Sequence, residues 1–97
     1  MNIRGKEQSH DALYEALLTL QTPAECAAFF EDLCTVSEIQ AMSQRLEVAK
    51  MLRAQSPYSE IVEKTGASSA TISRVGRCLN YGKDGYKTVL KRLDEAK

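Results

Sequence analysis

Apolar residues recur along the chain at intervals of three and four, which is the spacing of helices that bury one face. Outside the segment of residues 58–81, four such sets appear: Leu13, Leu17 and Leu20; Cys26, Phe29, Phe30 and Leu33; Ile39, Met42, Leu46, Ala49 and Leu52; and Tyr86, Val89, Leu90 and Leu93. No segment shows the strict alternation of a strand, and no internal repeat appears. The pattern therefore predicts an all-α fold of about six helices.

Capping signals predict where these helices begin and end. Ser9 precedes the first stripe as a candidate N-cap. Capping boxes at residues 22–25 and 35–38 open the second and third helices, and Pro23 suits the first helical position. Gly and Asn at residues 80–85 mark a break before the last helix.

Residues 58–81 have the organisation of a helix-turn-helix, in which a short glycine-containing turn joins two helices. Gly66 supplies the turn. Ile61 precedes it by five residues, while Ile72 and Val75 follow it by six and nine. This spacing packs the two helices together, although short glycine-turn helix pairs also serve as packing or partner-docking units.

The outer face of the second helix carries the candidate chemistry. Opposite the stripe around Ile72, a helical wheel places Ala70, Arg74 and Arg77. Arginine can pair with guanine O6 and N7, and a methyl group can contact thymine, so this face suits a DNA major groove. Ser68, as the expected N-cap, would leave the next two amides facing a phosphate. The candidate DNA-contacting residues are Ser68, Ser69, Ala70, Thr71, Ser73, Arg74 and Arg77.

Charge is segregated along the chain, although 13 basic and 13 acidic residues give a net charge of zero. Residues 1–63 hold five basic and ten acidic side chains, and residues 64–97 hold eight basic and three acidic ones. The carboxy-terminal part is therefore suited to a polyanion. The cations that follow the motif, which either contact phosphate or form a solvated face, are Lys83, Lys87, Lys91 and Arg92.

Other functional classes lack their signatures. The chain has no apolar run of about 18 residues and no signal-peptide core, so we expect a cytoplasmic protein with no membrane contact. Cys26, Cys34 and Cys78 lack C-x-x-C spacing and are expected to be free thiols in a reducing compartment. His10 is the only histidine. No metal site or catalytic residue is predicted, and an enzyme is the least favoured function.

The expected domain organisation is a flexible leader at residues 1–8 and a single helical DNA-binding domain at residues 9–97, with the helix-turn-helix at about 58–80. A chain of this length has limited surface to bury by itself. The first two helices are very apolar, and the adjacent Phe29 and Phe30 widen that surface. These features predict a homodimer in which the first helices wrap the second subunit.

Residues 65–74 resemble the reading head of the Trp repressor-like family, a Gly-Ala turn followed by Ala-Thr-Ile-Thr-Arg. Residues 80–82, with Tyr86 and Leu90, are similar to its YerC/YecD-type branch. The resemblance covers about residues 13–93 and implies an intertwined all-helical dimer that binds operator DNA.

The resemblance also implies possible effector contacts, at Arg74, at Arg45 if one residue is gapped, and at Cys78. Cys78 stands where the repressor has a serine, and Val75 where it has a glycine against the indole ring. A branched side chain would intrude on a flat ring, and a thiol bonds more weakly than a hydroxyl. Tryptophan is therefore not the expected corepressor, and no other cofactor is expected, although another small ligand stays open.

Two functions compete on this evidence. The first is a sequence-specific DNA-binding transcriptional regulator, expected to be a repressor, that reads a palindromic operator in double-stranded DNA through its helix-turn-helix. The alternative is a protein-interaction module that docks on a larger transcription complex through its acidic helices. Their response to salt would separate them, because phosphate-driven binding weakens steeply as salt rises.

Overall fold

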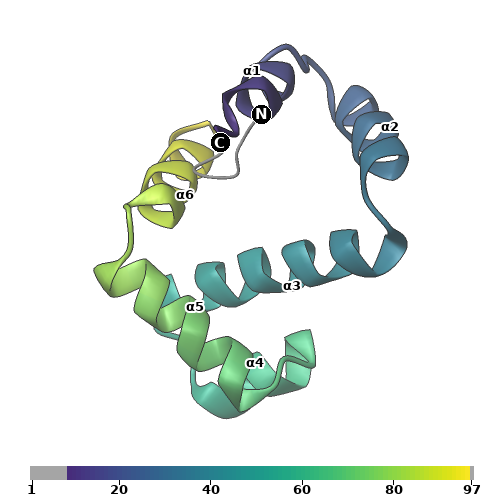
Figure 1. Ribbon diagram of the computed structural model, residues 1–97. Coiled ribbons are helices and arrows are strands. Elements are labelled where there is room, and N and C mark those ends of the chain that lie inside the picture. The colour runs from purple at the N-terminus through teal and green to yellow at the C-terminus, as the bar shows by residue number, and fades with distance from the viewer. Residues whose placement is uncertain (1–8, 97) are drawn as a thin grey trace. The chain divides into compact units, whose positions relative to one another are not determined.

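The computed structural model describes residues 9–96, and these form helices and connecting turns without a strand (Figure 1). The helices are α1 Asp11–Leu17, α2 Pro23–Leu33, α3 Val36–Arg53, α4 Tyr58–Thr65, α5 Ser69–Tyr81 and α6 Gly85–Glu95. The predicted all-α fold is confirmed. The predicted leader, residues 1–8, lies outside the described residues. The described residues divide at the start of α3 into two compact units, residues 9–36 and residues 37–96.

The first unit contains α1 and α2, whose ends differ in part from the prediction. The Ser9 hydroxyl accepts from the Asp11 amide at 3.1 Å, but the residue at the N-cap is His10. α1 ends at Leu17 because a tight turn follows, in which the Leu20 amide donates to the Leu17 carbonyl at 3.2 Å. The prediction that Leu20 extends the stripe of this helix was therefore wrong.

The capping box that opens α2 is present in a widened form. The Thr22 hydroxyl accepts from the Glu25 amide at 3.1 Å, as expected of an N-cap. The Glu25 carboxylate accepts from the Gln21 amide at 2.8 Å, one residue before the usual partner in a capping box. The two bonds fix the start of α2 from sequence-local groups alone.

The second unit contains the hydrophobic core, which α3, α4, α5 and α6 build together. Its buried members are Val48, Ala49, Met51, Ile61, Ala67, Ile72, Val75 and Leu90, with Leu46, Leu52 and Tyr86 packed against them. All of these residues lie within residues 46–90. The core therefore supports the helix-turn-helix directly, since four of its members, from Ile61 to Val75, lie in α4, in the turn that follows it and in α5.

The buried face of α3 departs from the predicted stripe. Ala49 is buried as predicted, but Met42 is exposed, while Val48 and Met51 are buried without having been predicted. The burial is concentrated in the carboxy-terminal half of α3, where other helices of the second unit pack around more than one side. A single stripe of three- and four-residue steps describes a helix covered on one side only.

A Schellman motif ends α3 and directs the chain toward α4. The Ser56 amide donates to the Met51 carbonyl at 2.9 Å, and the Gln55 amide donates to the Leu52 carbonyl at 3.0 Å. Gln55 takes a left-handed conformation with φ of 62°, a position more often held by glycine. Pro57 then forms the N-cap of α4.

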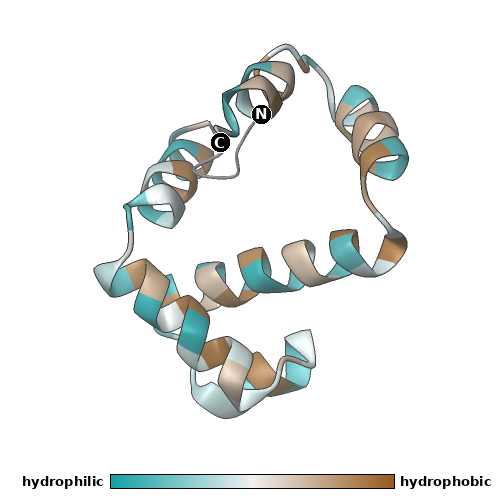
Figure 2. Cartoon of the chain, viewed as in Figure 1, coloured by the Kyte–Doolittle hydropathy of each residue, from teal (hydrophilic) through white to brown (hydrophobic). Residues whose placement is uncertain are grey.

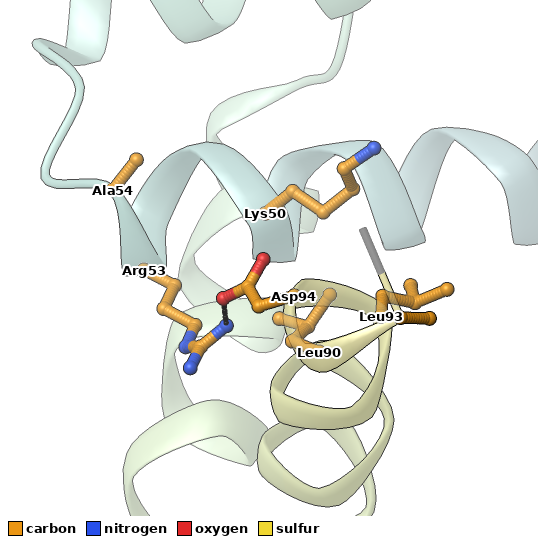
Figure 3. Close-up of a pocket in the computed structure, with 7 residues that line it drawn as sticks. Lys50, Arg53, Ala54, Leu90, Leu93 and Asp94 are labelled. Carbon is orange, nitrogen blue, oxygen red and sulfur yellow. Dashed lines mark hydrogen bonds and ion pairs between the residues drawn. The ribbon is translucent and has the colours of Figure 1, made fainter.

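One side of α6 packs against the core, and the prediction for its inward face was correct only in part. Leu90 is buried and Tyr86 is half-buried, but Val89 and Leu93 are 48% and 46% exposed. An ion pair joins α6 to α3, with Arg53 Nη1 and Asp94 Oδ2 2.7 Å apart. Figure 3 shows this pair beside Leu90 and Leu93, which line an open groove below α3.

Candidate nucleic-acid interface

The turn between α4 and α5 forms at Gly66, as predicted. Gly66 is the C-cap of α4 in a left-handed conformation with φ of 70°, and its amide donates to the Val62 carbonyl at 2.9 Å. A Cβ atom placed on Gly66 would meet no heavy atom within 4 Å. Glycine is thus required here by the backbone conformation, which side chains disfavour, and not by lack of space.

Thr65 holds the turn with its side chain. Its hydroxyl donates to the Ile61 carbonyl at 2.7 Å and accepts from the Ala67 amide at 3.1 Å. The Thr65 carbonyl in turn accepts from the side-chain amide of Gln44, on α3, at 3.0 Å. Neither Thr65 nor Gln44 was predicted as a site residue, because a bond between positions 21 apart leaves no local sequence signal.

Ser68 caps α5, as predicted. Its hydroxyl accepts from the Thr71 amide at 3.1 Å and donates to the Thr71 hydroxyl at 3.1 Å. The amides of Ser69 and Ala70 have no partner among residues 9–96, and both residues are exposed. The first turn of α5 therefore offers two free amide donors together with the positive end of the helix dipole, while the one proton of the Ser68 hydroxyl is already donated to Thr71.

The two faces of α5 differ sharply in burial, and apolar and polar residues follow one another along its ribbon in Figure 2. The inner face is buried at Ile72, Val75 and Leu79, which are 5%, 1% and 8% exposed. Gly76 lies between them, where a Cβ atom would approach Leu52 Cδ1 to 3.7 Å. Every residue of the predicted outer face is exposed. These residues are Ala70, Ser73, Arg74 and Arg77.

The positive charge on this outer face is not neutralised. Arg74 and Arg77 form no ion pair within residues 9–96, and the first turn of α5 has no acidic residue. Lys64 on α4 differs, because it lies 3.1 Å from the carboxylate of Glu60. The exposed face of α5 thus carries two guanidinium groups, small side chains and free amides. Together these groups can bind phosphates and base edges.

The four cations that follow α5 are exposed, and one of them forms an ion pair. Lys87 lies 3.9 Å from the carboxylate of Asp84, with both side chains more than half exposed. Lys83, Lys91 and Arg92 form no ion pair within the described residues. Lys87 and Lys91 also line a shallow groove with Arg53. Both interpretations of these cations, phosphate contact and solvated face, fit this arrangement.

The candidate effector residues lie on two helices of the second unit. Arg45 is a half-buried residue of α3, while Arg74 is exposed and Cys78 is half-buried on α5. Neither the groove below α3 nor the groove beside Lys91 is lined by any of the three. Val75, next to Arg74, is fully packed in the core, so its side chain is not free to form the floor of a ligand site.

Two further features concern the whole described part of the chain. Within residues 9–96, no three His, Cys, Asp or Glu side chains gather in a way that could hold a metal ion. Over the same residues, no helix has both the length and the apolar composition needed to cross a bilayer. Cys26, Cys34 and Cys78 are all free thiols and half-buried.

Comparisons with known proteins agree on one family. A family model described as Trp repressor protein matches residues 8–94. The chain is 55% identical over 93 residues to the uncharacterized protein YerC of Bacillus subtilis (strain 168), an alignment that covers 96% of this chain and 88% of that protein.

Two solved structures are also similar. A crystal structure of a candidate Trp repressor from Staphylococcus aureus has a TM-score of 0.84 and 52% identity, covering 87% of this chain and 84% of that one. A TrpR-like protein from Eubacterium eligens ATCC 27750 has a TM-score of 0.86 and 56% identity, and 92% of each chain is covered.

Proposed function

The chain belongs to the Trp repressor family, a family of helix-turn-helix DNA-binding regulators, and we propose that it represses transcription by binding a specific operator. The observation that carries this proposal is the outer face of α5, which is exposed and holds two arginines without acidic partners. A helix face used only for packing would be covered by other parts of the protein. The family is one of regulators rather than enzymes, and we propose no catalytic role.

In this proposal α5 enters the major groove with its first turns. Arg74 reads a guanine in bidentate fashion, and Ala70 contacts a thymine methyl group. Ser69 and the free amides of the first turn bind phosphate and set the register, and Ser68 supports this contact as the N-cap that holds those amides in place. Ser73 and Arg77 lie further along the same exposed face and add contacts to bases or to the backbone, and Thr71 supports the turn through Ser68.

We further propose that the protein binds DNA as a homodimer. α1 and α2 bury no side chain, and Leu18 and Leu33 are 85% and 51% exposed, so these helices have apolar surface for a second copy to cover. In helix-turn-helix dimers, the Trp repressor among them, half-sites lie about 10 to 10.5 base pairs apart. The operator of this protein is therefore expected to be a palindrome with that spacing. A cytoplasmic location follows from the same proposal.

Tryptophan is not the proposed corepressor. Val75 is 1% exposed within the core, and a β-branched side chain there leaves less room for a flat ring than a glycine would. Cys78 offers a weaker hydrogen-bond partner than a hydroxyl. Titration of the protein with tryptophan in a calorimeter is expected to give no binding heat, and binding in the micromolar range would contradict this part of the proposal. A different small ligand at Arg45, Arg74 and Cys78 stays open.

The experiment that tests the proposal replaces Arg74 by alanine. Loss of one bidentate guanine contact should weaken operator binding by about 1 to 3 kcal/mol and relax the preference at that base pair. Lys64→Ala is the matched control, because Lys64 is also a cation of the helix-turn-helix but is paired with Glu60 on α4. Equal operator affinity of the Arg74→Ala and wild-type proteins would exclude Arg74 as a reader.

Salt dependence tests the competing interaction module. If six phosphates are contacted, affinity should fall roughly 10³-fold between 50 and 200 mM salt. A flat response, with binding to a protein partner instead of DNA, would favour the interaction module.

A further inference from the structure

A single side chain connects α3 to the helix-turn-helix at the point where α4 ends. The Gln44 side-chain amide donates to the Thr65 carbonyl at 3.0 Å, in a partly buried position. Thr65 is the last residue of α4, where carbonyl groups have no partner within the helix. The bond thus satisfies a helix-end acceptor and ties the turn to α3 at the same time.

From Thr65 the bonds continue into α5. The Thr65 hydroxyl accepts from the Ala67 amide at 3.1 Å, and Ala67 is 4% exposed. The next residue, Ser68, caps α5 through the Thr71 amide. A continuous series of hydrogen bonds and adjacent residues therefore runs from α3 to the first turn of the exposed helix.

The apolar core alone does not fix the same geometry. Hydrophobic contacts are non-directional, so Ile61 and Ile72 can keep their burial over a range of small rotations of α4 and α5 against α3. A hydrogen bond constrains both distance and angle. Gln44 supplies such a directional contact next to the turn, and an apolar side chain of the same length could not.

We propose that Gln44 is a positioning residue that orients the helix-turn-helix for sequence-specific reading, without itself contacting DNA. The inference rests on the proposed function, because it concerns how well the first turn of α5 fits its groove. Loss of the bond should reduce discrimination between operator and random DNA. Affinity for random DNA should persist, because the exposed Arg74 and Arg77 still attract phosphates.

The test compares Gln44→Met with Gln40→Met in the full chain. Methionine keeps the length of glutamine but cannot donate, and Gln40 is an exposed residue one turn earlier on α3. Gln44→Met should lower the ratio of operator to random-DNA affinity by about tenfold, as expected for one lost hydrogen bond. Gln40→Met should leave the ratio unchanged.

A restoring variant separates positioning from general stability. Lysine at position 44 can also donate to the Thr65 carbonyl. Gln44→Lys should keep most of the operator preference that Gln44→Met loses. Equal loss in the two variants, or equal ratios in Gln44→Met and Gln40→Met, would overturn the proposal. If Gln44→Met does not fold, the ratio of operator to random-DNA affinity is compared between Gln44→Lys and wild type. A Gln44→Lys protein that has lost the operator preference would then overturn the proposal.

Amide hydrogen exchange tests the role of Gln44 without DNA. Gln44→Met should exchange faster than Gln40→Met at residues 65–72, by about tenfold, with little change in α6. If the wild-type protein prefers no DNA sequence, the proposed function fails, and exchange alone then decides whether Gln44 holds the turn. Equal exchange in both variants would show that it does not.

Discussion

The pair of helices α1 and α2 and the pair α4 and α5 each contain one helix with a side-chain cap, but the two pairs bury very different amounts of side chain. Thr22 caps α2 and Ser68 caps α5 through the same bond, in which a hydroxyl accepts from the third following amide at 3.1 Å. α1 and α2 bury no side chain, whereas the buried residues of α4 and α5 are Ile61, Ile72, Val75 and Leu79. Local sequence thus defines helices in both regions, but burial depends on the surface that packs against them.

The difference indicates how the two regions contribute to function. α4 and α5 complete their inner face within one chain, which leaves the outer face of α5 available for a ligand. The first pair exposes large apolar side chains at Tyr14, Leu18 and Leu33. In the proposed dimer these are the residues that a second copy covers. One region would then read DNA and the other would join the two readers.

The largest effect is expected from a charge placed in the packed region. Val75→Asp would bury a carboxylate without a partner, at a position 1% exposed. The loss of folding free energy should be at least about 4 kcal/mol, which is most of the stability of a small domain. Thermal unfolding followed by circular dichroism measures it. Ser73→Asp, two residues away on the exposed face, should change stability by only about 0.5 kcal/mol.

If Val75→Asp unfolded cooperatively at the melting temperature of the wild-type protein, that result would contradict the packing described for α5.

A charge in the first region should act on assembly and spare the fold of the second unit. Leu33 is 51% exposed, and a lysine in the last turn of α2 suits the helix dipole, so Leu33→Lys should cost little in a single chain. In a dimer the same change should raise the dissociation constant about 100-fold, or by about 2.7 kcal/mol. Sedimentation equilibrium measures this, with Gln21→Lys as an exposed control.

If the wild-type protein stayed monomeric at micromolar concentration, that result would contradict the proposed dimer. It would also contradict the assignment of α1 and α2 to assembly.

Two glycines of the packed region differ in the space available to an added methyl group. A Cβ atom on Gly82, the C-cap of α5, would clash with the Cys78 carbonyl oxygen, so Gly82→Ala should lower stability by about 1 to 3 kcal/mol. A Cβ atom on Gly76 would lie 3.7 Å from Leu52 Cδ1, an ordinary contact. Gly76→Ala should therefore be neutral or raise stability by up to about 1 kcal/mol. Denaturant unfolding distinguishes them, and the reverse order would contradict the described packing of α5.

The smallest effects come from the two matching caps. Ser68→Ala and Thr22→Ala should each lower stability by about 1 kcal/mol. Ser68→Ala should also weaken operator binding, because Ser68 fixes the first turn of α5. Thr22→Ala should weaken association but leave the affinity of the assembled protein for the operator unchanged. Binding titrations above the dimer dissociation constant make this distinction, and identical losses of operator affinity would argue against separate roles.

The helix-turn-helix could be predicted from the sequence because its determinants are local. Gly66 supplies a left-handed residue, Ser68 supplies a cap, and α5 is covered on one side only, so a simple wheel separates Val75 from Arg74. The placement of these residues is therefore as predicted. Their contact with DNA stays a prediction.

Other features could not be predicted because they depend on contacts between distant segments. Val48 and Met51 are buried because several helices pack around the end of α3, and no single stripe encodes that. Leu93 matches an inward stripe but is 46% exposed, since only part of α6 is covered within the second unit. The bond from Gln44 to Thr65 joins residues that share no local pattern.

In the proposed function, the outer face of α5 reads DNA. The most direct test is to select bound oligonucleotides from a random pool with the wild-type and Arg74→Ala proteins. The wild-type protein should enrich a palindrome with half-sites about 10 to 10.5 base pairs apart. Arg74→Ala should relax one base pair in each half-site. No enriched sequence with the wild-type protein, or an identical palindrome with Arg74→Ala, would contradict that assignment.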